Sequence, residues 1–244
     1  MDKVVASPSE AVADIADGSS IAMGGFGTAG VPWALVDALH RQGARHLRVV
    51  SNNCGFNGVG LAVLLRDNRI DRVTASYIGT NEEFARQYLA GSIEVELTPQ
   101  GTLAERLRAG GAGIAAFFTP TGVGTVVAEG GLPLRYAPGG EVLVASEPKE
   151  VRRFPFGDRE GDFVLERAIV TDYAFVRAAV ADRQGNAIFH AAARNFNPDV
   201  AMAGRTTILE AAQVVEVGDL DVDAVHLPGI FVHRVVCAAE EVPT

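Results

Sequence analysis

The fold is decided by the stretch Gly24-Gly25-Phe26-Gly27-Thr28-Ala29-Gly30, which lies between two apolar segments. The preceding segment, Ser20–Met23, has the composition of a buried strand, and residues 31–42 have the apolar spacing of an amphipathic helix. Glycines leave backbone N–H groups unshielded, and a helix that begins after them presents its positive end to an anion. We therefore expect an anion-binding turn between a strand and a helix.

The alternation of strand and helix continues along the first half of the chain. Strands are expected at residues 47–50, 73–78 and 93–97, with helices that begin at Asn81 and after Gly101. From residue 119 the pattern changes to a long loop-like stretch, 119–131, followed by strand-like runs and a hairpin turn at 182–186. This pattern predicts an α/β fold in one domain, 1–244. Its open sheet is largely parallel with helices on both faces, and more antiparallel strands lie in the C-terminal half.

Composition excludes several classes of function. The formal net charge of −9 over 244 residues disfavours nucleic-acid binding, because no basic surface is available to replace counterions. No apolar run approaches the roughly 18 residues that a membrane span needs. The two cysteines, Cys54 and Cys237, lie far apart without neighbouring metal ligands, so we expect a reducing compartment and no metal site. A cytoplasmic protein that binds neither nucleic acid nor membrane is the expectation.

The glycine spacing also fits a nicotinamide-dependent oxidoreductase, because Gly25, Gly27 and Gly30 form G-x-G-x-x-G. That fold needs a carboxylate about 20 residues later, at the tip of the second strand, to bind the ribose. The tip here is Ser51-Asn52-Asn53, with amides in place of a carboxylate. The dinucleotide hypothesis therefore lacks its confirming residue and stays the alternative.

Motifs along nearly the whole chain support a more specific interpretation. They are Asp17-Gly18, Gly24-Gly25-Phe26, Gly30 and Pro32; Ser51-Asn52-Asn53-Cys54-Gly55; residues 83–89; residues 94–106; residues 110–113; residues 118–122; Asp182-Arg183 with Gly185-Asn186; residues 193–197; and His226-Leu227-Pro228-Gly229. With these motifs in this order, the chain resembles the family I coenzyme A-transferases. Among them, it resembles the A subunits of 3-oxoacid coenzyme A-transferases.

The resemblance implies the coenzyme A-transferase fold and transfer of CoA between carboxylic acids. The donor would be an acyl-CoA such as succinyl-CoA, and the acceptor a 3-oxo acid, acetoacetate or 3-oxoadipate. In the family the reaction passes through a glutamyl-CoA thioester whose Glu lies in a Ser-Glu-Asn-Gly segment of the B subunit. This sequence has no Glu-Asn-Gly. The chain thus resembles half an enzyme, active in an α2β2 heterotetramer with a B subunit and needing no cofactor beyond its CoA substrate.

The candidate site residues follow from the same pattern. The turn from Gly24 to Gly30 is the expected substrate- and CoA-binding loop, with Asn52 and Asn53 at the neighbouring strand end. Gln100 closes the expected fourth strand, and its neutral amide could donate to an oxyanion; the resemblance also places the matching Gln at the active centre. The alternatives are that Gln100 only caps a turn, that Asn53 only forms one, and that the chain is a non-catalytic acyl-CoA-binding protein.

Some positions depart from the family pattern. Thr28-Ala29 stands where the family has Leu-Cys or similar, Thr80 replaces the Glu of Gly-Glu-Asn, and Asn57 replaces an Asp. The geometry of the turn is expected to survive these changes, whereas the choice of acid is left open by them.

Overall fold

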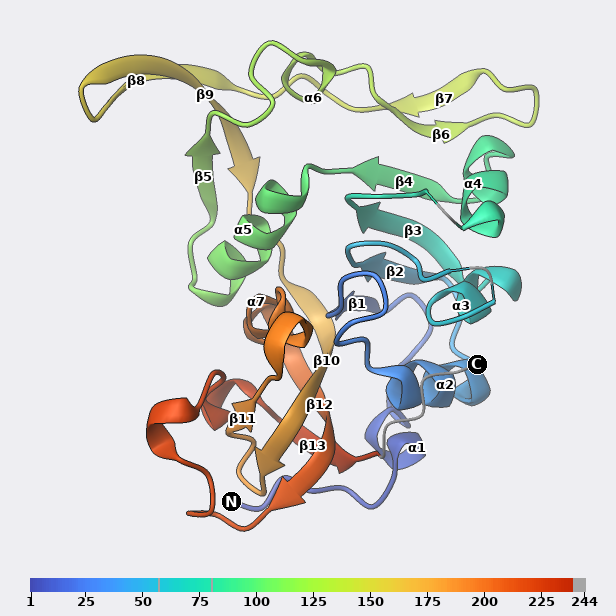
Figure 1. Cartoon of the computed structure of the whole chain (residues 1–244). Helices are drawn as coiled ribbons and strands as arrows, with labels where there is room; N and C mark the ends of the chain where they lie inside the picture. Colours follow the sequence, from blue (N-terminus) through green and yellow to red (C-terminus); the bar gives the residue numbers. More distant parts are fainter. Residues whose placement is uncertain (57, 80, 239–244) are drawn as a thin grey trace.

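A computed structural model describes residues 1–56, 58–79 and 81–238. Its centre is a parallel sheet whose strands follow one another in the order β13-β12-β10-β1-β2-β3-β4 (Figure 1). These strands are β1 (Ser20–Met23), β2 (Leu47–Val50), β3 (Ile70–Ala75), β4 (Glu94–Leu97), β10 (Thr171–Asp182), β12 (Gly204–Val215) and β13 (Arg234–Cys237). The short β11 (Ala187–Ile188) pairs antiparallel with β10, as the hairpin turn at 182–186 predicts.

The order of the strands reverses beside β1. The chain proceeds from β1 through β2 and β3 to β4, and then crosses to the other side of β1, where β10, β12 and β13 follow. Open α/β sheets bind ligands in the crevice at such a switch point. The glycine turn that follows β1 lies at this position.

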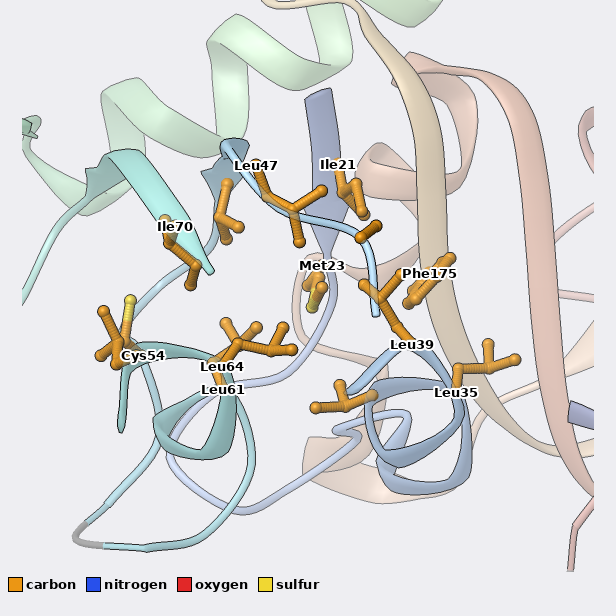
Figure 2. Packing of buried hydrophobic residues seen from close by; sticks show 14 of the residues in the cluster. Ile21, Met23, Leu35, Leu39, Leu47, Cys54, Leu61, Leu64, Ile70 and Phe175 are labelled. Carbon is orange, nitrogen blue, oxygen red and sulfur yellow. The ribbon is translucent and has the colours of Figure 1, made fainter. Parts of the chain in front are cut away.

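Helices cover both faces of the sheet. One face is covered by α1 (Pro8–Ala11), α2 (Trp33–Gln42), α3 (Ala62–Arg66) and α4 (Glu82–Leu89), and the other by α5 (Gln100–Gly111) and α7 (Asn197–Ala203). Figure 2 shows the first of these cores, in which leucines of α2 and α3 contact side chains of the strands. Its labelled members are Ile21, Met23, Leu35, Leu39, Leu47, Cys54, Leu61, Leu64, Ile70 and Phe175. Burial of this apolar surface fixes α2, and with it the turn that precedes α2.

Apart from β11, the antiparallel strands form two small sheets beyond β4 (Figure 1). One contains β5 (Ala116–Thr119), β9 (Arg159–Arg167) and β8 (Val151–Phe156), and the other contains β6 (Pro133–Tyr136) and β7 (Val142–Ala145). The expectation of a parallel sheet with antiparallel strands later in the chain is confirmed. The later strands β10, β12 and β13 nevertheless extend the parallel sheet, so the antiparallel ones are concentrated between residues 116 and 167.

Three local predictions were wrong. β3 ends at Ala75 rather than Ile78, because the N–H groups of Ser76 and Tyr77 both donate to the Asn52 carbonyl and turn the chain. The stretch 119–131 contains the end of β5 and a short helix, α6 (Val126–Glu129), whose amino end is capped by the Thr125 hydroxyl. Gln100 does not close β4. It is the first residue of α5, because Pro99 is the N-cap of this helix.

The remaining short elements are the 3-10 helices η1 (Ala191–Arg194), η2 (Val222–Ala224) and η3 (Gly229–Phe231). Within the described residues, the structure contains no helix with the length and apolarity of a membrane span. The departures at positions 57 and 80 lie outside the described residues.

Candidate active site

The turn after β1 is narrow and closed by its own backbone. The N–H of Phe26 donates to the Ala29 carbonyl over 3.0 Å, and the N–H of Ala29 donates back to the Phe26 carbonyl over 3.1 Å. Gly25, Gly27 and Gly30 have φ values of 114°, 61° and 71°, in the left-handed region that favours glycine. Around Gly27 an added Cβ would meet nothing within 4 Å, so backbone conformation rather than space requires glycine there.

The turn borders Asn53 and two cavities. Gly24, Gly25 and Gly27 share a small cavity with Asn53. Thr28, Ala29 and Gly30 line a second cavity of about 420 Å³. The Phe26 side chain is 53% exposed, and Trp33, at the start of α2, is buried against Gly60. The structure thus brings the predicted turn and Asn53 together.

Asn53, Asn52 and Gln100 form one chain of hydrogen bonds along the carboxyl edge of β2, β3 and β4. The Gly55 N–H donates to Asn53 Oδ1 (2.8 Å), and Asn53 Nδ2 donates to Asn52 Oδ1 (2.9 Å). Asn52 Nδ2 then donates to Gln100 Oε1 over 2.9 Å. A backbone N–H can only donate, so this first bond fixes the orientation of every following amide. We refer to the three side chains as the amide relay.

The relay determines which end of Gln100 is available for chemistry. Its Oε1 accepts from Asn52 and also from the Ser76 hydroxyl, over 2.5 Å. The amide NH₂ of Gln100 therefore lies on the side away from Asn52 and Ser76, where it can donate to a ligand. Asn52 is 4% exposed, and hydrogen bonds in such surroundings strengthen one another. Although Gln100 begins a helix instead of ending a strand, its side chain reaches the expected edge of the sheet.

The sequence profile described as coenzyme A transferase matches residues 5–238. The chain belongs to the coenzyme A transferase family. The A subunit of a probable succinyl-CoA:3-ketoacid coenzyme A transferase from Mycobacterium tuberculosis H37Rv is 60% identical over 237 residues, 97% of this chain and 94% of the relative. The similarly named Bacillus subtilis protein is 49% identical over 241 residues, which cover 99% of this chain and 92% of that relative.

Other proteins to which this chain is similar are longer. The human mitochondrial succinyl-CoA:3-ketoacid coenzyme A transferase 2 is 49% identical over 234 residues, which are 96% of this chain but 44% of the human protein. An acyl-CoA transferase from Escherichia coli O157:H7, solved as a thioester complex with CoA, has a TM-score of 0.78 and 23% identity. The match covers 97% of this chain and 47% of the Escherichia coli one. Glutaconate coenzyme A-transferase from Acidaminococcus fermentans, with a TM-score of 0.76, 22% identity and coverage of 97% and 76%, has the same fold.

Of the two cysteines in this coenzyme A transferase chain, Cys54 has a structural role. Cys54 is fully buried, and this burial raises the pKa of its thiol, so it is a small core side chain rather than a nucleophile. Among the described residues, no three His, Cys, Asp or Glu side chains are grouped so that they could hold a metal ion.

Sequence reasoning missed the side chains that support the site from other elements. Ser76 binds Gln100 and follows β3, but a serine after a strand is too common to single out. Asn195 and Asn197 lie against the turn, and residues 193–197 entered only as one motif of the family resemblance. A buried ion pair between Arg177 of β10 and Glu210 of β12 was also missed, because the pair forms only when the two strands are in register.

Glu210 connects this buried pair to the beginning of α2. Its Oε1 lies 3.4 Å from Arg177 Nη1, and its Oε2 accepts from the Leu35 N–H over 3.1 Å. The carboxyl is 1% exposed, and burial raises its pKa to about 7, although the Leu35 N–H and Arg177 act in the opposite direction. Glu210 therefore changes its charge near neutral pH.

We expect Glu210→Gln to reduce the pH dependence of stability. Between the ordinary pKa of a glutamate and about 7, the folded protein keeps a proton that the unfolded chain releases, so the wild type loses stability as pH rises through this window. The loss amounts to at most about 3 kcal/mol. Urea unfolding at pH 5 and pH 8 measures it. The same fall in both proteins would show that Glu210 does not titrate in this range.

Proposed function

We propose that this chain is the A subunit of a 3-oxoacid coenzyme A-transferase. It transfers CoA from an acyl-CoA such as succinyl-CoA to a 3-oxo acid, acetoacetate or 3-oxoadipate. The names of the Mycobacterium and Bacillus relatives support this substrate class. The observation that carries the proposal is the amide relay, which runs from Asn53 beside the glycine turn to Gln100 at the carboxyl edge of β4.

The relay suits acyl transfer because it offers a neutral donor. Attack on the thioester carbonyl places negative charge on its oxygen, and an N–H group held in position stabilises that charge without lowering the pKa of a nearby carboxylate nucleophile. No carboxylate is among the described residues that line the small cavity between the turn and Asn53. In this proposal the nucleophilic Glu comes from the partner, the B subunit, and forms the glutamyl-CoA thioester. Gln100 and the turn contact the acyl group.

The partner would complete the site at the exposed side of the turn. Phe26 is 53% exposed beside backbone that should contact substrate, so a partner chain on this side would bury its aromatic ring. The human relative supports this proposal, because this chain matches 44% of the human protein, and the remainder is long enough to be a second half of comparable length. We propose an α2β2 assembly in which Phe26 and residues 119–131 contribute to a site between unlike subunits.

Thr28 and Ala29 bear on the choice of acid. Both line the cavity of about 420 Å³, so their size sets the room on that side of the turn. Larger side chains at these positions, as in the family pattern, would reduce this room. A 3-oxo acid longer than acetoacetate therefore fits the proposal.

The function is tested with the chain co-expressed with its B subunit. We expect the complex to convert succinyl-CoA and acetoacetate or 3-oxoadipate into succinate and the new acyl-CoA, followed by absorbance of the 3-oxoacyl-CoA enolate. Titration with NADH is expected to show no binding, because Asn52 occupies the place of the ribose-binding carboxylate. Absence of transfer with every 3-oxo acid, or micromolar NADH affinity, would contradict the proposal.

A further inference from the structure

The backbone of the glycine turn is held from behind by a segment about 170 residues later in the sequence. We propose that Asn195 and Asn197 are positioning residues that fix the turn in the shape required for acyl transfer. This inference rests on the proposed function for its kinetic consequence, but its structural part concerns the turn alone. Neither side chain needs to touch the substrate.

Asn195 contacts both ends of the turn with one amide. Its Oδ1 accepts from the Gly25 N–H over 3.2 Å, and its Nδ2 donates to the Ala29 carbonyl over 3.1 Å. The same Nδ2 lies 3.1 Å from the Ala192 carbonyl and 3.2 Å from that of Ala193, so the amide is also tied to its own segment. The side chain thus sets the separation between Gly25 and Ala29.

Asn197 fixes the end of the turn and joins it to the sheet. Its Nδ2 donates to the Gly30 carbonyl over 3.1 Å, and its Oδ1 accepts from the backbone N–H of Arg177 in β10 over 3.1 Å. The side chain is fully buried at the amino end of α7. The turn is therefore hydrogen-bonded, through Asn197, to the strand on the other side of the switch point.

The close approach of the 193–197 segment to the turn explains why two positions of the turn are glycine. A Cβ added to Gly24 would lie 1.8 Å from Asn197 Oδ1, and one added to Gly30 would lie 2.4 Å from the Ala193 carbonyl oxygen. Space at these positions is taken by the 193–197 segment, whereas at Gly27, on the open side, it is not. The glycines thus serve two purposes: some allow the turn to contact its support, and Gly27 leaves the opposite side free.

Loss of this support should change the chemistry more than the binding of CoA. The turn has few internal hydrogen bonds and several glycines, so without Asn195 its backbone gains freedom. Misplacement of groups at a reacting centre by about 1 Å costs up to 10²-fold in rate. Contacts of the CoA moiety that lie away from the turn would remain.

The test uses Asn195→Gly in the complex with the B subunit. Asn195 has a φ of 26°, so glycine keeps the backbone and removes only the amide. We expect kcat to fall about 10- to 100-fold with KM for acyl-CoA changed less than about threefold. Hydrogen exchange of the peptide covering 24–30 should become about tenfold faster. Asn195→Asp keeps the acceptor for Gly25 but places a carboxylate oxygen against the Ala29, Ala192 and Ala193 carbonyls, so it should lose at least as much as Asn195→Gly.

The matched control is Asn68→Gly, which replaces another left-handed asparagine, with a φ of 51°, before β3 at the opposite edge of the sheet. It should change neither kcat nor exchange of 24–30. Unchanged kcat in Asn195→Gly, unchanged exchange, or an equal loss in Asn68→Gly would overturn the inference. If the wild-type complex transfers no CoA, the proposed function fails, and the exchange measurement still decides whether Asn195 holds the turn.

Discussion

Replacing Gln100 with alanine is expected to lower kcat of the assembled enzyme by on the order of 10²- to 10³-fold, with a much smaller change in KM. The Gln100 oxygen is bound by Asn52 and Ser76, which leaves its NH₂ on the side away from them, where the proposed mechanism uses it as a donor. A donor held in this way gains strength as the carbonyl oxygen gains charge. Its loss therefore affects the transition state more than the bound substrate.

The control for this experiment is a glutamine with a structural partner. Gln42, at the end of α2, donates its amide to the Ile15 carbonyl over 2.8 Å, at the opposite edge of the sheet. Gln42→Ala should cost about 1 kcal/mol of stability and leave kcat intact. Steady-state kinetics and thermal melts on both variants separate the two roles. A lower melting temperature with unchanged kcat in Gln100→Ala would assign this residue to the fold.

The second large effect concerns the chain by itself. We expect the purified polypeptide to have no CoA-transferase activity, and to gain it when a B subunit is added. The physical reason is that, in the proposed mechanism, the relay and the turn only donate to an oxyanion, whereas the thioester intermediate needs a carboxylate nucleophile. Size-exclusion chromatography of the co-expressed pair should give one peak of α2β2 size.

Gln42→Ala is a suitable control for this experiment as well, because the Gln42 amide donates to the Ile15 carbonyl at the end of α2, away from the turn and the relay. It should behave as the wild type does, inactive alone and active with the partner. Steady turnover by the isolated wild-type chain, without a B subunit, would contradict a division of the site between two chains.

The parts of the site that local sequence could predict are those made by neighbouring residues. Gly25, Gly27 and Gly30 have positive φ values, and such a turn between a strand and a helix is visible in the spacing alone. Asn52 and Asn53 could be placed because they lie two and three residues after the end of β2, and the carboxyl ends of parallel strands meet at one edge of the sheet. The alternation of β1, β2, β3 and β4 with helices determined this part of the fold.

The parts that could not be predicted depend on pairing between distant segments. Asn195 contacts Gly25 across 170 positions of sequence, and no local pattern carries that contact. β10 pairs with β1, and β12 with β10, only after the chain has crossed the sheet. Whether Arg177 lies opposite Glu210 therefore depends on the register between β10 and β12. Gln100 was expected at the correct edge of the sheet but as the end of a strand, whereas it is the first residue of α5, after the N-cap Pro99.

The central claim is that this chain is the half of a coenzyme A-transferase that stabilises the acyl group, while the partner carries the covalent intermediate. The most direct measurement is intact mass spectrometry of both chains after the complex is mixed with succinyl-CoA and no acceptor. We expect a CoA adduct on the partner chain, at a glutamate, and an unmodified mass for this chain. An adduct on this chain, with the partner unmodified, would contradict the claim.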